Sequence, residues 1–208
     1  MIVAVTGTVG SGKSRVSAML AAALGCESVD TDTICRQLML PGMPGWDEMQ
    51  KRWETRFIGA DGQVDRSMLR EAVFTDLAVR RELEAILHPL VKQRVTAEIG
   101  LARERKQNLL LEIPLLYEVG WQDGMDGVVA VYVPRRVSVA RTSRRDDVDR
   151  QQVESILAAQ LSALQKAERA DWVIDNSGLW AATALQVAHL AWQWHVRQSS
   201  GNAWCIHL

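Results

Sequence analysis

The sequence is poor in the features that mark secreted, zinc-stabilised and membrane-spanning proteins. Its 208 residues include three cysteines, and their odd number and wide spacing argue against a disulfide framework or a zinc site. There is no run of about 18 apolar residues, the length that a membrane helix needs. We expect no signal peptide, because the first residues show neither a basic start nor a cleavage signal. A formal net charge of −1 creates no overall attraction to nucleic acid or to an anionic membrane. We therefore expect a cytoplasmic protein without a nucleic-acid or membrane partner.

What is present suits one globular domain, because 48% of the residues are hydrophobic. Short apolar, β-branched runs alternate with segments of helical periodicity, which favours a parallel sheet with helices on both faces. The pattern predicts strands over 2–7, 27–32, 108–113, 127–133 and 171–175. It predicts helices over 13–24, 47–56, 66–74, 77–87, 89–105 and 150–169, one that follows Pro134, and a last one that ends near Gln198.

Glycines, a lysine and a serine crowd the segment that follows the first predicted strand, "TGTVGSGKS". Gly7, Gly12, Lys13 and Ser14 satisfy the pattern G-x-x-x-x-G-K-[ST] of a phosphate-binding loop. Glycines let such a loop wind tightly, so that backbone N–H groups surround a phosphate, and the following helix directs its positive dipole end at the same anion. The lysine would reach the β- and γ-phosphates and the serine hydroxyl would bind Mg²⁺, so the motif predicts a nucleoside triphosphate and Mg²⁺ as ligands.

Three carboxylates stand where predicted strands end. Asp30 and Asp32 are two residues apart, so we expect their side chains to point the same way and one of them to accept a proton during phosphoryl transfer. The alternative is a turn or a helix N-cap. Glu112 ends another strand, a position where a carboxylate that organises Mg²⁺ often lies. The alternative is that this single acid has a purely structural role.

Arg141, Arg144 and Arg145 share one face of a predicted helix, as stabilisation of a transferring phosphoryl group would require. A solvated helix face is the alternative. The chain contains neither Asn-Lys-x-Asp, which reads guanine, nor the transporter signature "LSGGQ". These absences favour a small-molecule kinase.

Further motifs extend along residues 3–178: "VDTDTICRQL", "DGQVDRSMLREAVF", "LEAILHPLV", "EIPLLYE", "RTSRRDDV", "ILAAQ" and "ADWVIDNSG". Together with the phosphate loop, the sequence resembles the dephospho-CoA kinase family. The resemblance implies a P-loop kinase fold, with a five-stranded parallel sheet, a helical substrate-binding insertion and a lid. It implies transfer of a phosphoryl group from ATP to the ribose 3′-hydroxyl of dephospho-CoA, which is the last step of coenzyme A biosynthesis.

The resemblance also assigns roles to residues of this chain. ATP would be bound by Gly7, Val9, Gly10, Ser11, Gly12, Lys13, Ser14, Arg141 and Asn176. Dephospho-CoA would be bound by Asp32, Arg36, His88 and Leu115, and Mg²⁺ by Ser14 and Glu112. Catalysis would rest on Lys13, Asp32 as the base, Arg141 and Arg145. The chain departs from the family pattern at Thr8, where a glycine is usual, and at Glu112, where an aspartate is usual.

The expected organisation is a single domain over 1–208. Its core would comprise 1–60, 107–134 and 170–198, its helical insertion 61–106, its lid 135–169 and its tail 199–208. We expect a monomer or a weak homo-oligomer. Two alternatives for function remain: another P-loop small-molecule kinase, such as a nucleoside monophosphate kinase, and a non-catalytic ATP-binding regulatory module.

Overall fold

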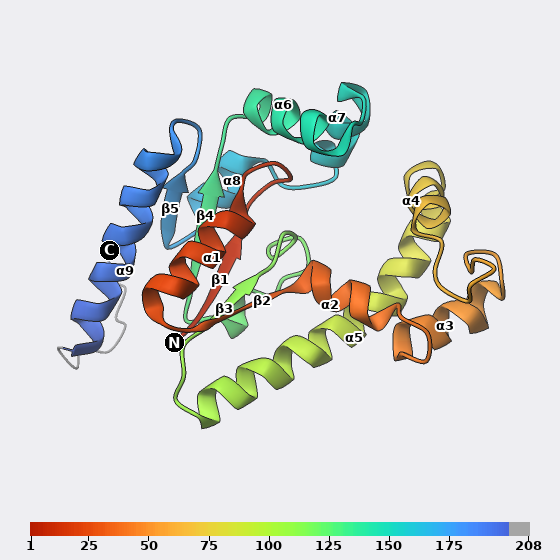
Figure 1. Cartoon of the computed structure of the whole chain (residues 1–208), viewed down its shortest axis with the longest axis horizontal. Helices are drawn as coiled ribbons and strands as arrows, with labels where there is room; N and C mark the ends of the chain where they lie inside the picture. Colours follow the sequence, from red (N-terminus) through yellow and green to blue (C-terminus); the bar gives the residue numbers. More distant parts are fainter. Residues whose placement is uncertain (200–208) are drawn as a thin grey trace. The chain divides into compact units, whose positions relative to one another are not determined.

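The protein is an α/β chain, seen in a computed structural model that describes residues 1–199, with side chains up to residue 196 (Figure 1). Most of the predicted tail therefore lies outside the described residues. In chain order the elements are β1 (Ile2–Thr6), α1 (Lys13–Leu24), β2 (Glu27–Asp30), α2 (Thr31–Leu38), α3 (Pro44–Trp53), α4 (Arg66–Thr75), α5 (Leu77–Glu104), β3 (Leu109–Glu112), the 3₁₀ turn η1 (Gln122–Gly124), β4 (Gly127–Tyr132), α6 (Arg135–Asp146), α7 (Arg150–Ala158), α8 (Ala163–Arg169), β5 (Trp172–Asp175) and α9 (Trp180–Ser199).

The five strands form one sheet in the order β2-β3-β1-β4-β5, which confirms the predicted five-stranded parallel sheet. β1 is the central strand, with Val3 in register with Leu110 on one side and Gly127 on the other. Such a sheet is covered on both faces, so the three inner strands β3, β1 and β4 are almost entirely buried. The edge strands β2 and β5 are more exposed. The loops that follow β1, β3, β4 and β5 all leave from the same edge, where ligands of open α/β sheets bind.

The chain divides into two compact units. The first contains residues 1–29 and the chain from Ala102 onward. Its core joins the sheet to α1 and α9, and Figure 1 shows α9 alongside α1 and β5. The fully buried Trp194 of α9 packs edge to face on Trp172, with ring centroids 5.0 Å apart. Burial of these apolar side chains is the main term that holds the helices on the sheet.

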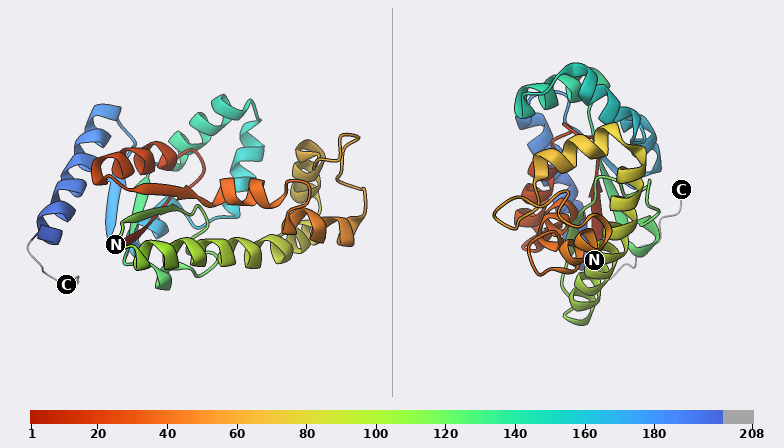
Figure 2. Two further views of the ribbon diagram at one scale, coloured as in Figure 1. Left: turned by 60° about the horizontal axis from the view of Figure 1, so that its bottom comes forward. Right: turned by 90° about the vertical axis from the view of Figure 1, so that its right-hand side faces the viewer.

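The second unit is Asp30–Leu101, and Figure 2 shows its helices in orange to yellow-green. It has a core of its own, built from Met49, Phe57, Leu69 and Val79. The segment between α3 and α4 is tied by one antiparallel bridge, Ile58 to Val64. The unit can therefore bury apolar surface without a strand of the sheet.

Three predicted helices have wrong bounds. α3 spans Pro44–Trp53, earlier in the chain than the predicted 47–56. Pro89 does not end a helix: α5 continues from Leu77 to Glu104 with this proline inside it. Leu87 and Val91 are both buried on either side of Pro89, so tertiary packing outweighs the lost hydrogen bond. The predicted helix over 150–169 is two helices, because Ser162 and Gln165 form a capping box that starts α8.

Within the described part of the chain, the structure has no helix that is both long and apolar enough to cross a bilayer.

Candidate active site

The segment between β1 and α1 has the strand–loop–helix arrangement that the motif predicts. β1 ends at Thr6, and α1 begins at Lys13. Gly10 and Gly12 have φ angles of 74° and 84°, in the left-handed region that favours glycine. Gly12 is also the N-cap of α1, so the first N–H groups of that helix have no side-chain cap and face the loop. The conformation suits an anion at this point.

Two parts of the structure pack against this loop: helix α6 and Asn176, the residue that follows β5. Behind Gly10 lies α6, and a Cβ at Gly10 would overlap the hydroxyl of Thr142 and come within 2.6 Å of the Ser138 carbonyl. Beside Gly12 lies Asn176, whose side-chain amide donates to the Ser11 carbonyl at 2.7 Å. Both glycines therefore also permit close packing against neighbouring elements.

Asn176 follows β5 and was predicted to contact the nucleotide. Its side chain is buried, and its oxygen accepts the Thr183 hydroxyl at 3.0 Å while its nitrogen holds Ser11. The structure thus gives the Asn176 side chain a structural task at the loop, and its contact with adenine stays a prediction.

Ser14 and Glu112 are brought together. The Ser14 hydroxyl donates to Glu112 Oε1 at 2.6 Å, which joins the first turn of α1 to the end of β3. Glu112 is 5% exposed, whereas Ser14 is exposed. A hydroxyl and a carboxylate at this distance are the oxygen donors that Mg²⁺ takes from P-loop proteins, alongside phosphate oxygens and water. The residues present therefore fit the predicted metal.

The expectation that Asp30 and Asp32 point the same way from one strand is wrong. β2 ends at Asp30, and Asp32 lies in the first turn of α2. Asp30 is the N-cap: its carboxylate accepts the Asp32 N–H at 3.0 Å, the Thr33 hydroxyl at 2.7 Å and an Arg36 N–H at 3.4 Å. The chain turns into α2 directly after Asp30, so the two aspartates do not alternate as they would in a strand. This helix start is favoured because the Asp30 cap satisfies N–H groups that otherwise have no partner.

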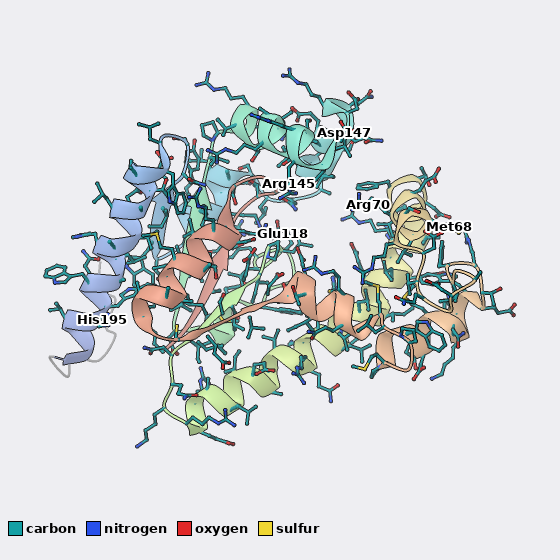
Figure 3. All side chains as sticks on the ribbon, in the orientation of Figure 1. Met68, Arg70, Glu118, Arg145, Asp147 and His195 are labelled. Atoms are coloured by element: carbon teal, nitrogen blue, oxygen red, sulfur yellow. The ribbon has the colours of Figure 1, made fainter. Side chains whose placement is uncertain are left out.

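The predicted lid arginines lie on α6. Arg145 is exposed and forms a bidentate ion pair with Asp146, with N···O distances of 2.7 and 2.8 Å. This hydrogen bond to Asp146 raises the pKa of the Arg145 guanidinium. Figure 3 labels Arg145 together with Asp147, whose left-handed conformation ends the helix. Arg141 lies between Ser138 and Thr142, the two residues that pack against Gly10.

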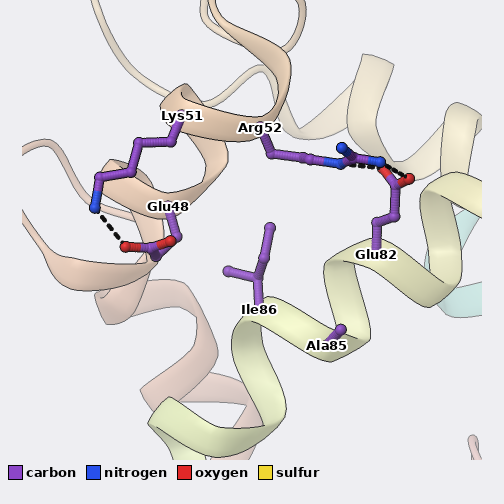
Figure 4. A pocket seen from close by; sticks show the side chains of 6 residues that line it. All are labelled: Glu48, Lys51, Arg52, Glu82, Ala85 and Ile86. Atoms are coloured by element: carbon purple, nitrogen blue, oxygen red, sulfur yellow. Dashed lines mark hydrogen bonds and ion pairs between the residues drawn. The ribbon is translucent and has the colours of Figure 1, made fainter.

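Of the predicted substrate residues, Arg36 is exposed and donates to Thr33 at 2.6 Å, and His88 is half-buried in α5. Leu115 is half-buried in the loop after β3. The helical unit also contains a pocket of about 350 Å³ (Figure 4). Its walls are formed by Glu48, Lys51, Arg52, Glu82, Ala85 and Ile86, and its charged side chains form two ion pairs within the wall. Arg36 and His88 do not line this pocket.

Cys35 lies on α2, near both aspartates. Burial raises the pKa of its thiol to about 11, and the charges of Asp32 and Asp30 act in the same direction. The thiol is therefore held neutral and unreactive at ordinary pH.

Three polar residues around the loop received no role from the sequence: Glu118, Gln160 and Lys166. They lie in the motifs "PLLYE" and "ILAAQ" or just after them, yet neither spacing nor type showed what they contact. In the structure Gln160 accepts a hydrogen bond from the phosphate loop, and Lys166 is buried against Glu118. A lysine at an inward position of a short helix was the one local signal.

Comparison with known proteins agrees with this arrangement. Residues 1–181 match the family described as dephospho-CoA kinase. The chain is 40% identical, over 188 residues, to the dephospho-CoA kinase of Desulfotalea psychrophila, which corresponds to 90% of this chain and 94% of that protein.

Two solved structures share the fold. The crystal structure of TT1252 from Thermus thermophilus has a TM-score of 0.76 at 30% identity, with 95% of this chain and 97% of that one covered. The dephospho-CoA kinase from Campylobacter jejuni has a TM-score of 0.69 over 97% and 98% of the two chains, and at 22% identity it supports the fold alone. The sequence match over nearly the whole chain shows that this protein belongs to the dephospho-CoA kinase family, the kinases of the final step of coenzyme A biosynthesis.

Proposed function

We propose that the chain transfers the γ-phosphoryl group of ATP to the ribose 3′-hydroxyl of dephospho-CoA, which yields CoA and ADP. The observation that carries this proposal is the loop between β1 and α1, with Ser14 in contact with Glu112, in a chain of this family. A glycine-lined loop at the start of a helix binds phosphates through backbone N–H groups, and Lys13 adds a positive charge for the β- and γ-phosphates.

Ser14 and Glu112 would hold Mg²⁺ by their hydroxyl and carboxylate oxygens. When bound, the ion neutralises charge on the β- and γ-phosphates. The ligand set is small, as expected for Mg²⁺, which keeps waters and phosphate oxygens in its coordination shell. The Ser14–Glu112 hydrogen bond keeps both donors in place before nucleotide binds.

We assign Asp32 as the base. It takes the proton of the 3′-hydroxyl as the ribose oxygen forms a bond to the γ-phosphorus, and the bond from that phosphorus to the bridging oxygen of ADP breaks. Arg141 and Arg145 stabilise the charge on the transferred group. The pair with Asp146 engages Nε and Nη2 of Arg145, so its remaining N–H groups are the ones that would reach the phosphoryl oxygens.

The remaining assignments are proposals of the same kind. Arg36, His88 and Leu115 bind dephospho-CoA, Asn176 lies at the nucleotide, residues 61–106 form the substrate-binding insertion and residues 135–169 the lid. We further propose that the protein acts in the cytoplasm as a monomer or a weak homo-oligomer.

A coupled assay of ADP release, with ATP and MgCl₂, tests the function. Dephospho-CoA, pantetheine, AMP and CMP serve as acceptors, a reaction without acceptor is the blank, and mass spectrometry of the product identifies one added phosphoryl group. We expect stimulation by dephospho-CoA alone. Stimulation by AMP or CMP would instead identify a nucleoside monophosphate kinase, and ATP binding without acceptor-dependent turnover would identify a regulatory module.

A further inference from the structure

In the phosphate loop, the backbone of Val9 forms hydrogen bonds with two side chains that are distant in sequence. The Val9 N–H donates to Gln160 Oε1 at 3.2 Å, and the Val9 carbonyl accepts the Ser138 hydroxyl at 2.9 Å. The Thr8 and Ser138 hydroxyls are also hydrogen-bonded, at 3.1 Å. Both peptide groups of Val9 are thus oriented by side chains rather than by a strand or a helix.

Gln160 belongs to the four-residue connection between α7 and α8, residues 159–162, which has no regular structure of its own. The connection is held at the next residue, because the Leu161 N–H donates to Glu118 Oε1 at 2.8 Å. Glu118, labelled in Figure 3, comes from the loop after β3. The segment that carries Gln160 is therefore itself hydrogen-bonded to the loop that follows β3.

The Glu118 carboxylate also accepts a hydrogen bond from Lys166 Nζ at 2.8 Å, and the same ammonium donates to the Pro114 carbonyl at 2.8 Å. Lys166 is fully buried. Burial lowers the pKa of Lys166 and the hydrogen bond to Glu118 opposes this shift, while the charge of Lys13 lowers the pKa further. A buried ammonium with two acceptors in place is a rigid anchor, because freeing either partner would leave an unpaired polar group inside the protein.

The anchor also contacts the beginning of the phosphate loop. The Pro114 carbonyl accepts the Thr6 hydroxyl at 3.3 Å in addition to Lys166 Nζ, and Thr6 directly precedes Gly7. The cluster of Lys166, Glu118 and Pro114 is thus linked to the loop at Thr6 directly and at Val9 through Gln160.

We propose that Gln160 is a positioning residue that orients the phosphate-binding loop for the nucleotide, and that the ion pair of the buried Lys166 with Glu118 holds the connection that carries it. A loop whose peptide groups are already oriented loses less conformational freedom when phosphates bind, so it binds them more tightly. The inference rests on the proposed nucleotide-binding role of this loop, and it is independent of the acceptor that receives the phosphoryl group.

The test compares Gln160→Ala with Gln152→Ala in the full-length chain. Gln152 is an exposed residue of α7 and serves as the matched control. Calorimetric titration with ADP and MgCl₂ gives Kd, and steady-state kinetics give KM for ATP and for dephospho-CoA. In Gln160→Ala we expect Kd for ADP and KM for ATP to rise about fivefold, the equivalent of one neutral hydrogen bond. We expect KM for dephospho-CoA to stay within about twofold of the wild-type value.

An ADP Kd in Gln160→Ala equal to that of Gln152→Ala would overturn the inference. So would an equal rise in KM for both substrates together with a lower melting temperature, since that result indicates general loosening of the fold. The proposed function fails separately: wild-type protein that binds ADP but shows no turnover stimulated by dephospho-CoA would refute the function, while the comparison of the two variants for ADP binding would still decide the role of Gln160.

Discussion

Replacing Lys166 by methionine removes the ammonium from the anchor and keeps much of its apolar volume. In the native chain the Lys166 side chain is 1% exposed and that of Glu118 is 17% exposed, so the ammonium is shielded from water and the carboxylate is only partly shielded, at an exposed residue. The substitution leaves the Glu118 carboxylate with the Leu161 N–H but without its countercharge, and the Pro114 carbonyl with the Thr6 hydroxyl alone. The carboxylate and the carbonyl then each lack one hydrogen-bond partner that they have in the native chain.

Removing one partner of a fully buried ion pair costs about 3–5 kcal/mol of the free energy of unfolding, and the partial exposure of Glu118 places this pair at the lower end, about 3 kcal/mol. For a chain of this size, each kcal/mol lowers the melting temperature by about 2–4 °C, so we expect a fall of roughly 6–12 °C. The second variant is Lys166→Met/Glu118→Gln, which removes the unpaired charge and keeps an amide oxygen for the Leu161 N–H. It should recover at least half of the loss, because the uncompensated charge is the largest part of the cost.

Scanning calorimetry of the wild type and the two variants checks this prediction. Lys51→Met is the matched control, since Lys51 also forms an ion pair with a glutamate but its side chain is 70% exposed. Exposed pairs contribute little, so this control should melt close to the wild type. A melting temperature of Lys166→Met within about 2 °C of the wild type would refute the view that the pair anchors the connection between α7 and α8.

Four further predictions concern the site and its surroundings. Lys13→Ala should lower kcat/KM by about a hundredfold or more, the loss expected for one charge-stabilising group, and near-normal kinetics would remove Lys13 from the site. Asp32→Asn should lower kcat while the Kd for ATP stays unchanged; weaker ATP binding at unchanged kcat would contradict its role as base. Gly12→Ala should cost about 1–3 kcal/mol in stability and weaken ADP binding, because residue 12 has a left-handed backbone conformation and the added Cβ would overlap the Asn176 amide. Thermal melting and ADP titration measure these two effects. At pH 9, alkylation of Cys35 in folded protein should be about fiftyfold slower than in denatured protein, since the folded pKa of about 11 lies above the ordinary value of 9.0.

The sign of the linked pH effect at Cys35 follows from the same shift. Between pH 9 and 11 the folded protein keeps the thiol proton that the unfolded chain releases, so the contribution of this thiol to stability is complete below pH 9 and is lost as pH rises through about 11. Peptide mapping by mass spectrometry follows Cys35 itself, and equal alkylation rates in folded and denatured protein would contradict the burial of this side chain.

Features that depend on neighbouring residues were predictable. The bounds of α1 were predicted correctly as Lys13–Leu24, because its apolar period and the following Gly25 are local signals. The phosphate loop was equally clear, since glycines, lysine and serine occur at fixed spacing between a strand and a helix. The order of the strands and the contact of Ser14 with Glu112 needed the fold itself, because those two residues are 98 positions apart in the chain.

Errors arose where two local rules compete or where tertiary packing decides. The break between α7 and α8 had a readable signal, the capping box at Ser162, but Asp149 suggested a single longer helix. Gln160 had no readable signal, and for Lys166 the only one was its inward position on a short helix. Their partners lie 151 and 48 residues away in sequence. Polar contacts of this kind depend on the packed structure and cannot be inferred from spacing.

Asp30 at the end of β2 and Asp32 in α2 bear on an assignment that residue spacing alone left open and that the family resemblance gave to Asp32. Strand alternation treated Asp30 and Asp32 as equivalent, and either could have been the base. In the structure the carboxylate of Asp30 accepts three hydrogen bonds, including the one that caps α2, so protonating it would weaken the start of that helix. Asp32 is exposed in the first turn, where its side chain does not cap the helix. The capping role of Asp30 and the exposure of Asp32 together favour Asp32 as the group that exchanges a proton with the acceptor.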